Sequence, residues 1–202
     1  MHIGEIVIIL IKMKKIYLVL THTGTTISEM IRKHTGHKYN HISISLKEDL
    51  SEMYSFGRLN PYIFFWGGFV IENPKKGTYK RFFKTIAKVL EVQVSDEAYS
   101  IIEYYINQFI ADKKTFGYNF RGILKARNNV NYQKSYRRFY CSQFVDYLLV
   151  CAHVIPEHNF GAIVKPEDFC SLENAKVLYE GLLREYNSAI FHSLDLLSED
   201  HF

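Results

Sequence analysis

Hydrophobic and polar residues alternate most clearly between residues 41 and 56. The segment His41–Leu46 places three apolar side chains on one face of a strand and three polar ones, the histidine among them, on the other. Residues 47–50 form a polar turn, and Glu52–Phe56 returns as a second strand. We predict a β-hairpin with one buried face and with Ile44 opposite Met53.

Two longer segments show the spacing of amphipathic helices. Ser95 precedes a run with acidic residues in its first turn and an apolar stripe that continues to Ile110, which predicts the longest helix. A second stripe predicts a helix from Tyr140 to about Ala152. We expect strands at 16–21, 69–72, 78–83 and 88–94, an aromatic loop at 59–68, and shorter helices at 27–34, 116–125, 166–171 and 174–186.

This order of elements predicts an α+β fold with an antiparallel sheet and packed helices. The 202 residues are 48% hydrophobic and include 15 Tyr and 15 Phe, which is enough for one substantial core, so we expect a single domain over residues 1–202. Met13 is followed by two lysines and resembles a natural start, so residues 1–12 can be an N-terminal extension.

Composition excludes several classes of function. The net charge of +4 is small and its basic residues are spread along the chain, which gives no indication of nucleic-acid binding. Neither apolar run near the N-terminus, at 6–11 and 16–20, approaches the roughly 20 residues of a membrane span. We find no signal peptide and expect a cytoplasmic protein.

The three cysteines at 141, 151 and 170 form no CxxC pair and leave an odd count. We therefore expect no disulfide framework and no structural metal site. Unpaired cysteines suit a reducing compartment, in which a free thiolate can be kept for chemistry.

Cys141 is the strongest candidate nucleophile. It lies at the predicted start of an amphipathic helix, directly after Arg137 and Arg138. Unpaired N–H groups and the positive end of the helix dipole favour thiolate over thiol, and the same N–H groups can stabilise an oxyanion. Taken by its position alone, Cys141 also fits a small buried cysteine in a core helix.

His41 is the candidate base because it opens the polar face of the predicted hairpin. A thiol nucleophile needs a base within hydrogen-bond reach, and imidazole is the usual one. A lone histidine on a strand also fits an exposed polar position. His22, in a turn, is the reserve candidate.

Both segments resemble a known family. The stretches Tyr39–Ser45 and Tyr140–Val145 resemble the circularly permuted branch of the NlpC-type cysteine peptidase superfamily, in which the histidine hairpin precedes the nucleophile helix. Residues 21–58, 67–69 and 179–181 are also similar to firmicute members. The histidine hairpin and the cysteine helix, about 100 residues apart in this order, carry most of the resemblance.

The resemblance implies a circularly permuted, papain-like NlpC-type fold and a third polar residue that orients the imidazole. The family places this residue on the strand after the histidine strand, where the chain offers Glu52 and Tyr54. A carboxylate stabilises an imidazolium better, which favours Glu52. The predicted register instead brings Tyr54 closer to His41. Both stay open at this point.

The resulting hypothesis is a cysteine hydrolase that cleaves an amide bond, peptide or isopeptide, through an acyl-enzyme, with no metal and no organic cofactor. Its substrate is a small peptide-like or acyl molecule, and murein fragments are what relatives in the superfamily cleave. The turn residues Thr23, Gly24 and Thr25 and the aromatic residues Tyr118 and Tyr140 are candidates to line the cleft. Two alternatives are a lipid acyl hydrolase or acyltransferase and a non-catalytic binding domain that keeps the fold.

Overall fold

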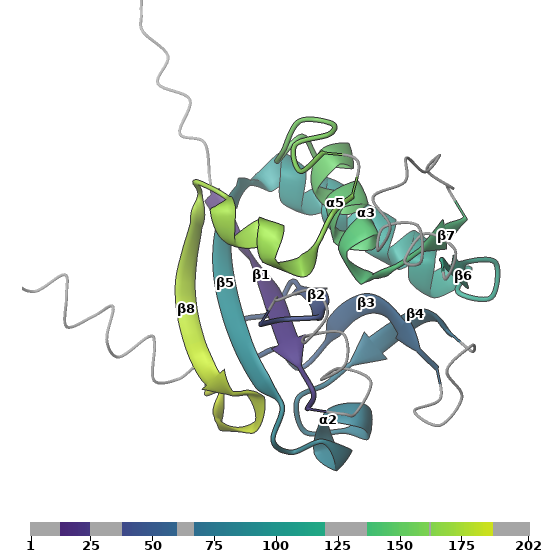
Figure 1. Cartoon of the computed structure of the whole chain (residues 1–202). Helices are drawn as coiled ribbons and strands as arrows, with labels where there is room; N and C mark the ends of the chain where they lie inside the picture. The colour runs from purple at the N-terminus through teal and green to yellow at the C-terminus, as the bar shows by residue number, and fades with distance from the viewer. Residues whose placement is uncertain (1–12, 25–37, 60–66, 120–136, 162, 188–202) are drawn as a thin grey trace, which may run out of the picture.

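A single curved sheet organises the protein (Figure 1). The computed structural model describes residues 13–24, 38–59, 67–119, 137–161 and 163–187. Among these residues the sheet has eight strands in the order β7-β6-β4-β3-β2-β1-β5-β8, and every neighbouring pair is antiparallel except β6 and β7. The strands are β1 (Met13–His22), β2 (His41–Ser45), β3 (Met53–Arg58), β4 (Gly67–Glu72), β5 (Ile86–Ser95), β6 (Gly117–Tyr118), β7 (Arg138–Phe139) and β8 (Ala175–Leu182).

Two helices cover one face of the sheet. They are α3 (Asp96–Ala111) and α5 (Cys141–Cys151), which pack against each other and, in Figure 1, lie together on the same side of the strands. The short helix α2 (Gly77–Arg81) and the 3-10 turns η1 (Pro166–Ser171) and η2 (Leu183–Glu185) lie in the connections. The prediction of an α+β fold with a mostly antiparallel sheet is confirmed.

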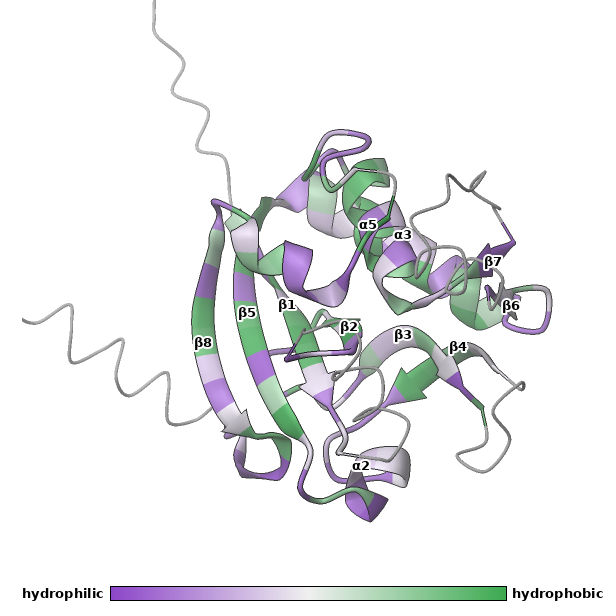
Figure 2. Cartoon of the chain, in the orientation of Figure 1, coloured by the Kyte–Doolittle hydropathy of each residue, from purple (hydrophilic) through white to green (hydrophobic). Residues whose placement is uncertain are grey.

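Aromatic rings fill the main core between the helices and the sheet. Phe56 and Phe144 are fully buried, and the ring centre of Phe56 lies 5.3 Å from that of Phe144 and 5.8 Å from those of Phe69 and Phe109. A smaller apolar cluster, which includes Val19, Met53 and Tyr79, covers the other face. Both faces of the central strands are therefore buried, which explains why β1 is hydrophobic along most of its length (Figure 2).

The start of α3 follows the predicted capping chemistry. The Ser95 side chain accepts a hydrogen bond from the Ala98 N–H at 3.1 Å, and Asp96 and Glu97 occupy the first turn. Ala98, Ile102, Ile106 and Phe109 form its buried stripe. The helix predicted at 140–152 is found as α5, whose apolar stripe is also buried.

Two predicted elements are wrong. Residues 78–83 begin in helix α2 and form no strand, and residues 174–186 contain strand β8 where a helix was predicted. In β8 and the residue after it, the apolar residues at 175, 178, 179, 182 and 183 have helical spacing. A β-bulge opposite Val89 and Leu90 adds Leu178 to the strand, so that Leu178 and Tyr179 both pack on the smaller cluster. Pairing with β5 overrides the local periodicity.

Two further expectations concern residues that are only partly described. Residues 117–118 of the helix predicted at 116–125 form strand β6, residues 116 and 119 flank it without helical structure, and residues 120–125 lie outside the described residues. The predicted helix at 27–34 and the extension at 1–12 lie wholly outside them.

Candidate active site

Cys141 is the first residue of α5, and polar side chains fix the start of this helix. Gln143 turns back to accept a hydrogen bond from the Tyr140 backbone N–H at 3.3 Å and another from the Asn119 amide at 3.0 Å. The first bond within the helix runs from the Phe144 N–H to the Tyr140 carbonyl. The earlier N–H groups have no partner inside the helix, so they and the dipole present positive charge near the sulfur.

His41 is the first residue of β2, where it pairs with Thr21 of β1. Helix α5 packs directly on β2 and β3, which brings its first residue to the start of the histidine strand. The His41 imidazole and the Cys141 thiol lie close enough that each shifts the pKa of the other. The two segments identified from the sequence thus meet in space.

A largely shielded carboxylate, that of Glu72, completes the arrangement. The Nε2 atom of His41 lies 3.1 and 3.2 Å from the two carboxylate oxygens of Glu72, at the end of β4. Nε2 is thereby occupied, which leaves Nδ1 for the sulfur. The exposed fractions of the two side chains are 19% for His41 and 14% for Glu72. This is the geometry by which a carboxylate orients an imidazole and stabilises its charged form.

Two hydroxyl groups hold Glu72 in turn. Ser43 donates a hydrogen bond to Oε2 of Glu72, and the Tyr79 hydroxyl donates another at 3.4 Å. Tyr79 is itself within 3.3 Å of Thr21 Oγ1. A buried carboxylate with several donors keeps its charge and its position.

The charges of the three groups support one another. Burial alone lowers the pKa of His41, but the Glu72 charge and the hydrogen bonds to Cys141 and Glu72 more than offset it, and the net pKa is raised well above its usual value. Burial alone raises the pKa of Glu72, and the His41 charge and hydrogen bonds reverse this and lower it. The carboxylate therefore stays ionised beside a protonated imidazole.

The thiol follows the same pattern. Burial raises the pKa of Cys141, but the hydrogen bond and charge of His41, together with hydrogen bonds from the backbone of Ile42 and Ser142, lower it overall. A thiolate beside an imidazolium is the form of this pair that the surroundings favour. Cys170 differs, because burial raises the pKa of its thiol.

The hairpin register explains which carboxylate reaches the histidine. Ile44 pairs with Tyr54, one residue away from the predicted partner Met53. The same register places Gly57 opposite His41, and Gly57 pairs with Gly68 of β4. A Cβ atom at Gly57 would lie 3.7 Å from the His41 ring and 4.0 Å from Glu72 Oε1. Both are ordinary contact distances, so β3 passes at Gly57 directly beside the place where the imidazole and the carboxylate meet.

Glu52 and Tyr54, the residues predicted to orient His41, lie elsewhere. Glu52 sits at the exposed hairpin turn, paired with Lys47 at 2.7 Å, and accepts a hydrogen bond from the Tyr54 hydroxyl at 3.2 Å. Because the register differs by one residue, neither side chain lies next to His41. Glu72, on β4 and two strands away from β2, takes the place of the orienting residue instead. Glu72 was not among the predicted site residues; the one signal in the sequence that could have found it is a carboxylate at the end of an apolar strand run.

The predicted cleft residues divide into two groups. Tyr118 and Tyr140 are neighbours of Cys141: burial raises the pKa of each hydroxyl, and the nearby Cys141 charge raises it further. Thr23 and Gly24 follow the end of β1, where Gly24 adopts a positive φ of 66°. Thr25 lies outside the described residues, and the reserve candidate His22 is buried at the end of β1 opposite Ile86 of β5.

A cluster around Glu180 of β8, which we call the Glu180 anchor, fixes the residues just before His41. The Glu180 carboxylate pairs with Lys38, accepts a hydrogen bond from the Tyr39 hydroxyl at 2.9 Å, and pairs with Lys88 at 3.1 Å. These contacts, the one to Lys38 above all, lower the pKa of Glu180 to about 2. Glu167 adds a bond from the Tyr39 N–H at 3.0 Å.

Two other kinds of feature, a metal centre and a membrane-spanning helix, are absent from the part of the chain that the structure describes. No group of three or more His, Cys, Asp or Glu side chains there is placed to hold a metal ion. No described helix is both long and apolar enough to cross a bilayer. The chain matches no family model, no curated protein and no solved structure.

Proposed function

We propose that this protein is a cysteine hydrolase in which Cys141 is the nucleophile, His41 the acid–base group and Glu72 the residue that orients it. The observation that carries the proposal is a thiol at a helix N-terminus, beside an imidazole that shifts its pKa and that is itself held 3.1 Å from the Glu72 carboxylate. Nucleophile, base and orienting group within hydrogen-bond reach are the usual requirement for covalent catalysis by a thiol.

The reaction follows from the geometry. The Cys141 sulfur attacks a carbonyl carbon, and the electron pair of the C=O bond moves to oxygen, where backbone N–H groups of the first turn of α5 stabilise it. The tetrahedral intermediate collapses, His41 gives its proton to the leaving amine or alcohol, and a thioester remains. Water then attacks the thioester and loses a proton to His41, which releases the acid and restores the thiolate.

The order of the elements supports a circularly permuted papain-like enzyme. The histidine strand β2 precedes the nucleophile helix α5 in the chain, and the helix packs on the antiparallel sheet that carries the histidine. The orienting carboxylate on β4 gives the candidate site a third member. The non-catalytic alternative was considered because the sequence left the third residue undecided between Glu52 and Tyr54.

A chromogenic ester tests the chemistry without knowledge of the substrate. We expect p-nitrophenyl acetate to acetylate Cys141, as shown by mass spectrometry, and to be turned over. Cys141→Ala should abolish both, and His41→Ala should reduce turnover by about 100-fold or more. Cys170→Ala, which removes an exposed thiol, is the matched control and should change neither.

Turnover by Cys141→Ala at the parent rate would exclude the proposed nucleophile. Acetylation of all three cysteines at similar rates would favour a non-catalytic domain. If the chemistry holds, peptide and isopeptide amides, murein fragments included, should be cleaved in preference to fatty-acyl esters. The reverse preference would assign the acyl hydrolase or acyltransferase activity instead.

A further inference from the structure

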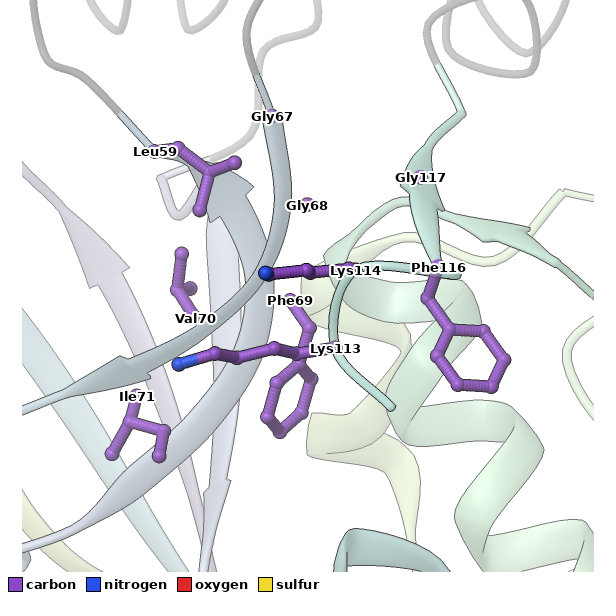
Figure 3. Close-up of a pocket in the computed structure, with 10 residues that line it drawn as sticks. All are labelled: Leu59, Gly67, Gly68, Phe69, Val70, Ile71, Lys113, Lys114, Phe116 and Gly117. Atoms are coloured by element: carbon purple, nitrogen blue, oxygen red, sulfur yellow. The ribbon is translucent and has the colours of Figure 1, made fainter. Parts of the chain in front are cut away.

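A second feature lies along the outer edge of β4, outside the three residues described above. A pocket of about 690 Å³ separates this edge from the turn between α3 and β6 (Figure 3). Five consecutive residues, 67–71, line it. Consecutive side chains of a strand point to opposite faces, so a wall made by all five is the backbone edge of the strand.

Most of this edge has no strand partner among the described residues. Strand β6 meets β4 at one pair, Gly68 with Gly117, and the chain then turns away. Residues 69–72 continue β4 beyond that pair. An unpaired edge presents backbone N–H and C=O groups to an incoming strand, which is how many proteins bind extended peptides.

Apolar and basic side chains gather at this edge. Leu59 and Ile71 line the pocket and are 48% and 53% exposed, a high value for such residues. Lys113 and Lys114 extend toward β4 from the opposite wall (Figure 3). The structure shows no ion pair between either lysine and another described residue, and no acidic residue is among those lining the pocket.

We propose that this edge, which we call the β4 edge, binds an extended acidic peptide segment as an added strand. Backbone hydrogen bonds to β4 provide the general affinity. Carboxylates of the segment face Lys113 and Lys114, and its apolar side chains cover Leu59 and Ile71. An acidic peptide is favoured because the lysines supply positive charge without a resident counter-charge.

The β4 edge adjoins the candidate active site at two points. Gly68 pairs with Gly57, which lies opposite His41, so it is two strands from the histidine, about 10 Å by the usual strand spacing. On the other wall, Gly117 precedes Tyr118, a neighbour of Cys141. A peptide on this edge can thus place a bond near the sulfur. This role as a substrate subsite rests on the proposed hydrolase function; the binding itself does not.

Binding is measured on the full chain carrying Cys141→Ala, so that no cleavage intervenes. The probe is a fluorescein-labelled hexapeptide of alternating valine and glutamate, followed by fluorescence anisotropy at low and high salt. We expect saturable binding that weakens with salt. Hexapeptides of alternating valine and glutamine, or valine and lysine, should bind at least tenfold more weakly.

Two changes test the two parts of the proposal. Lys113→Glu with Lys114→Glu should weaken binding of the acidic peptide by tenfold or more, whereas the matched reversal of another exposed adjacent pair, Lys75→Glu with Lys76→Glu, should leave it unchanged. The same acidic peptide with alternate amide nitrogens methylated should also lose binding, because it cannot complete the strand pairing.

Several results would overturn the inference. These are no binding of the acidic peptide at millimolar concentration, equal binding of all three peptides, or undiminished binding of the methylated one. Binding to phosphatidylserine vesicles but not to the peptide would show that the edge meets a membrane surface. If any of these outcomes is found while Cys141 of the parent protein is still alkylated rapidly, the peptide site is excluded and the hydrolase proposal stands.

Discussion

Replacing Glu72 by glutamine removes the charge beside His41 and keeps the size of the side chain. At a separation of 3.1 Å, two unit charges attract by about 5 kcal/mol for an effective dielectric constant of 20. Desolvation of the two ions offsets much of this, and charge-assisted hydrogen bonds are worth about 1.5–3 kcal/mol net. This range corresponds to a loss of roughly 10- to 100-fold in the population of the thiolate–imidazolium pair.

The assay is alkylation by iodoacetamide between pH 5 and 9, with each cysteine followed by mass spectrometry. At pH 6 Cys141 should react faster than the more exposed Cys170, because the pKa of the first is lowered and that of the second raised. Glu72→Gln should slow Cys141 by about 10- to 100-fold at pH 6 and leave Cys170 unchanged.

The matched control is Glu52→Gln, which alters an exposed carboxylate bonded to Lys47 and Tyr54. It should leave the alkylation profile of Cys141 as in the parent. An unchanged profile for Glu72→Gln, or equal effects of the two substitutions, would refute the assignment of Glu72 as the orienting group.

Three further predictions concern stability, each measured by urea unfolding. Phe56→Ala should cost about 3–5 kcal/mol because it opens a cavity among packed rings, whereas Tyr104→Ala, at a position that is 59% exposed, should change the free energy by less than about 0.5 kcal/mol. Ser95→Ala should cost about 1 kcal/mol through loss of the α3 cap, and an unchanged midpoint would contradict that role. The pKa of Glu72 is lowered, so the stability that Glu72 contributes is present above its ordinary pKa of 4.5 and is lost as pH falls. The pKa of His41 is raised, so the stability that His41 contributes is present below its ordinary pKa of 6.5 and is lost as pH rises. The stability difference between the parent and Glu72→Gln should therefore be largest from about pH 4.5 to 6.5, and a difference that does not vary with pH would contradict the ion pair.

Local chemistry made part of this structure predictable from the sequence. The histidine hairpin, the capped helix after Ser95 and the helix of Cys141 each have a pattern that lies within one short, continuous segment of the sequence. Their apolar stripes determine which faces are buried. Two of these segments carry the thiol and the imidazole, so the pair could be identified before their contact was known.

The missing parts depend on register and on pairing over long distances. A shift of one residue in the β2–β3 pairing changes which side chains are neighbours of His41, and the turn sequence alone left this register open. Glu72 reaches the histidine across a whole strand, beside Gly57. The apolar spacing at 175–183 is helical, and the bulge that accommodates it in a strand is seen only in the pairing of β8 with β5.

The Glu180 anchor has a consequence for synthesis on the ribosome. Both the histidine strand and the nucleophile helix leave the exit tunnel before β8, yet the carboxylate that fastens residues 38 and 39 belongs to β8. A nascent chain therefore carries its reactive pair without these contacts until β8 has emerged. The enzyme we propose would become competent only after β8 has left the exit tunnel and paired with β5.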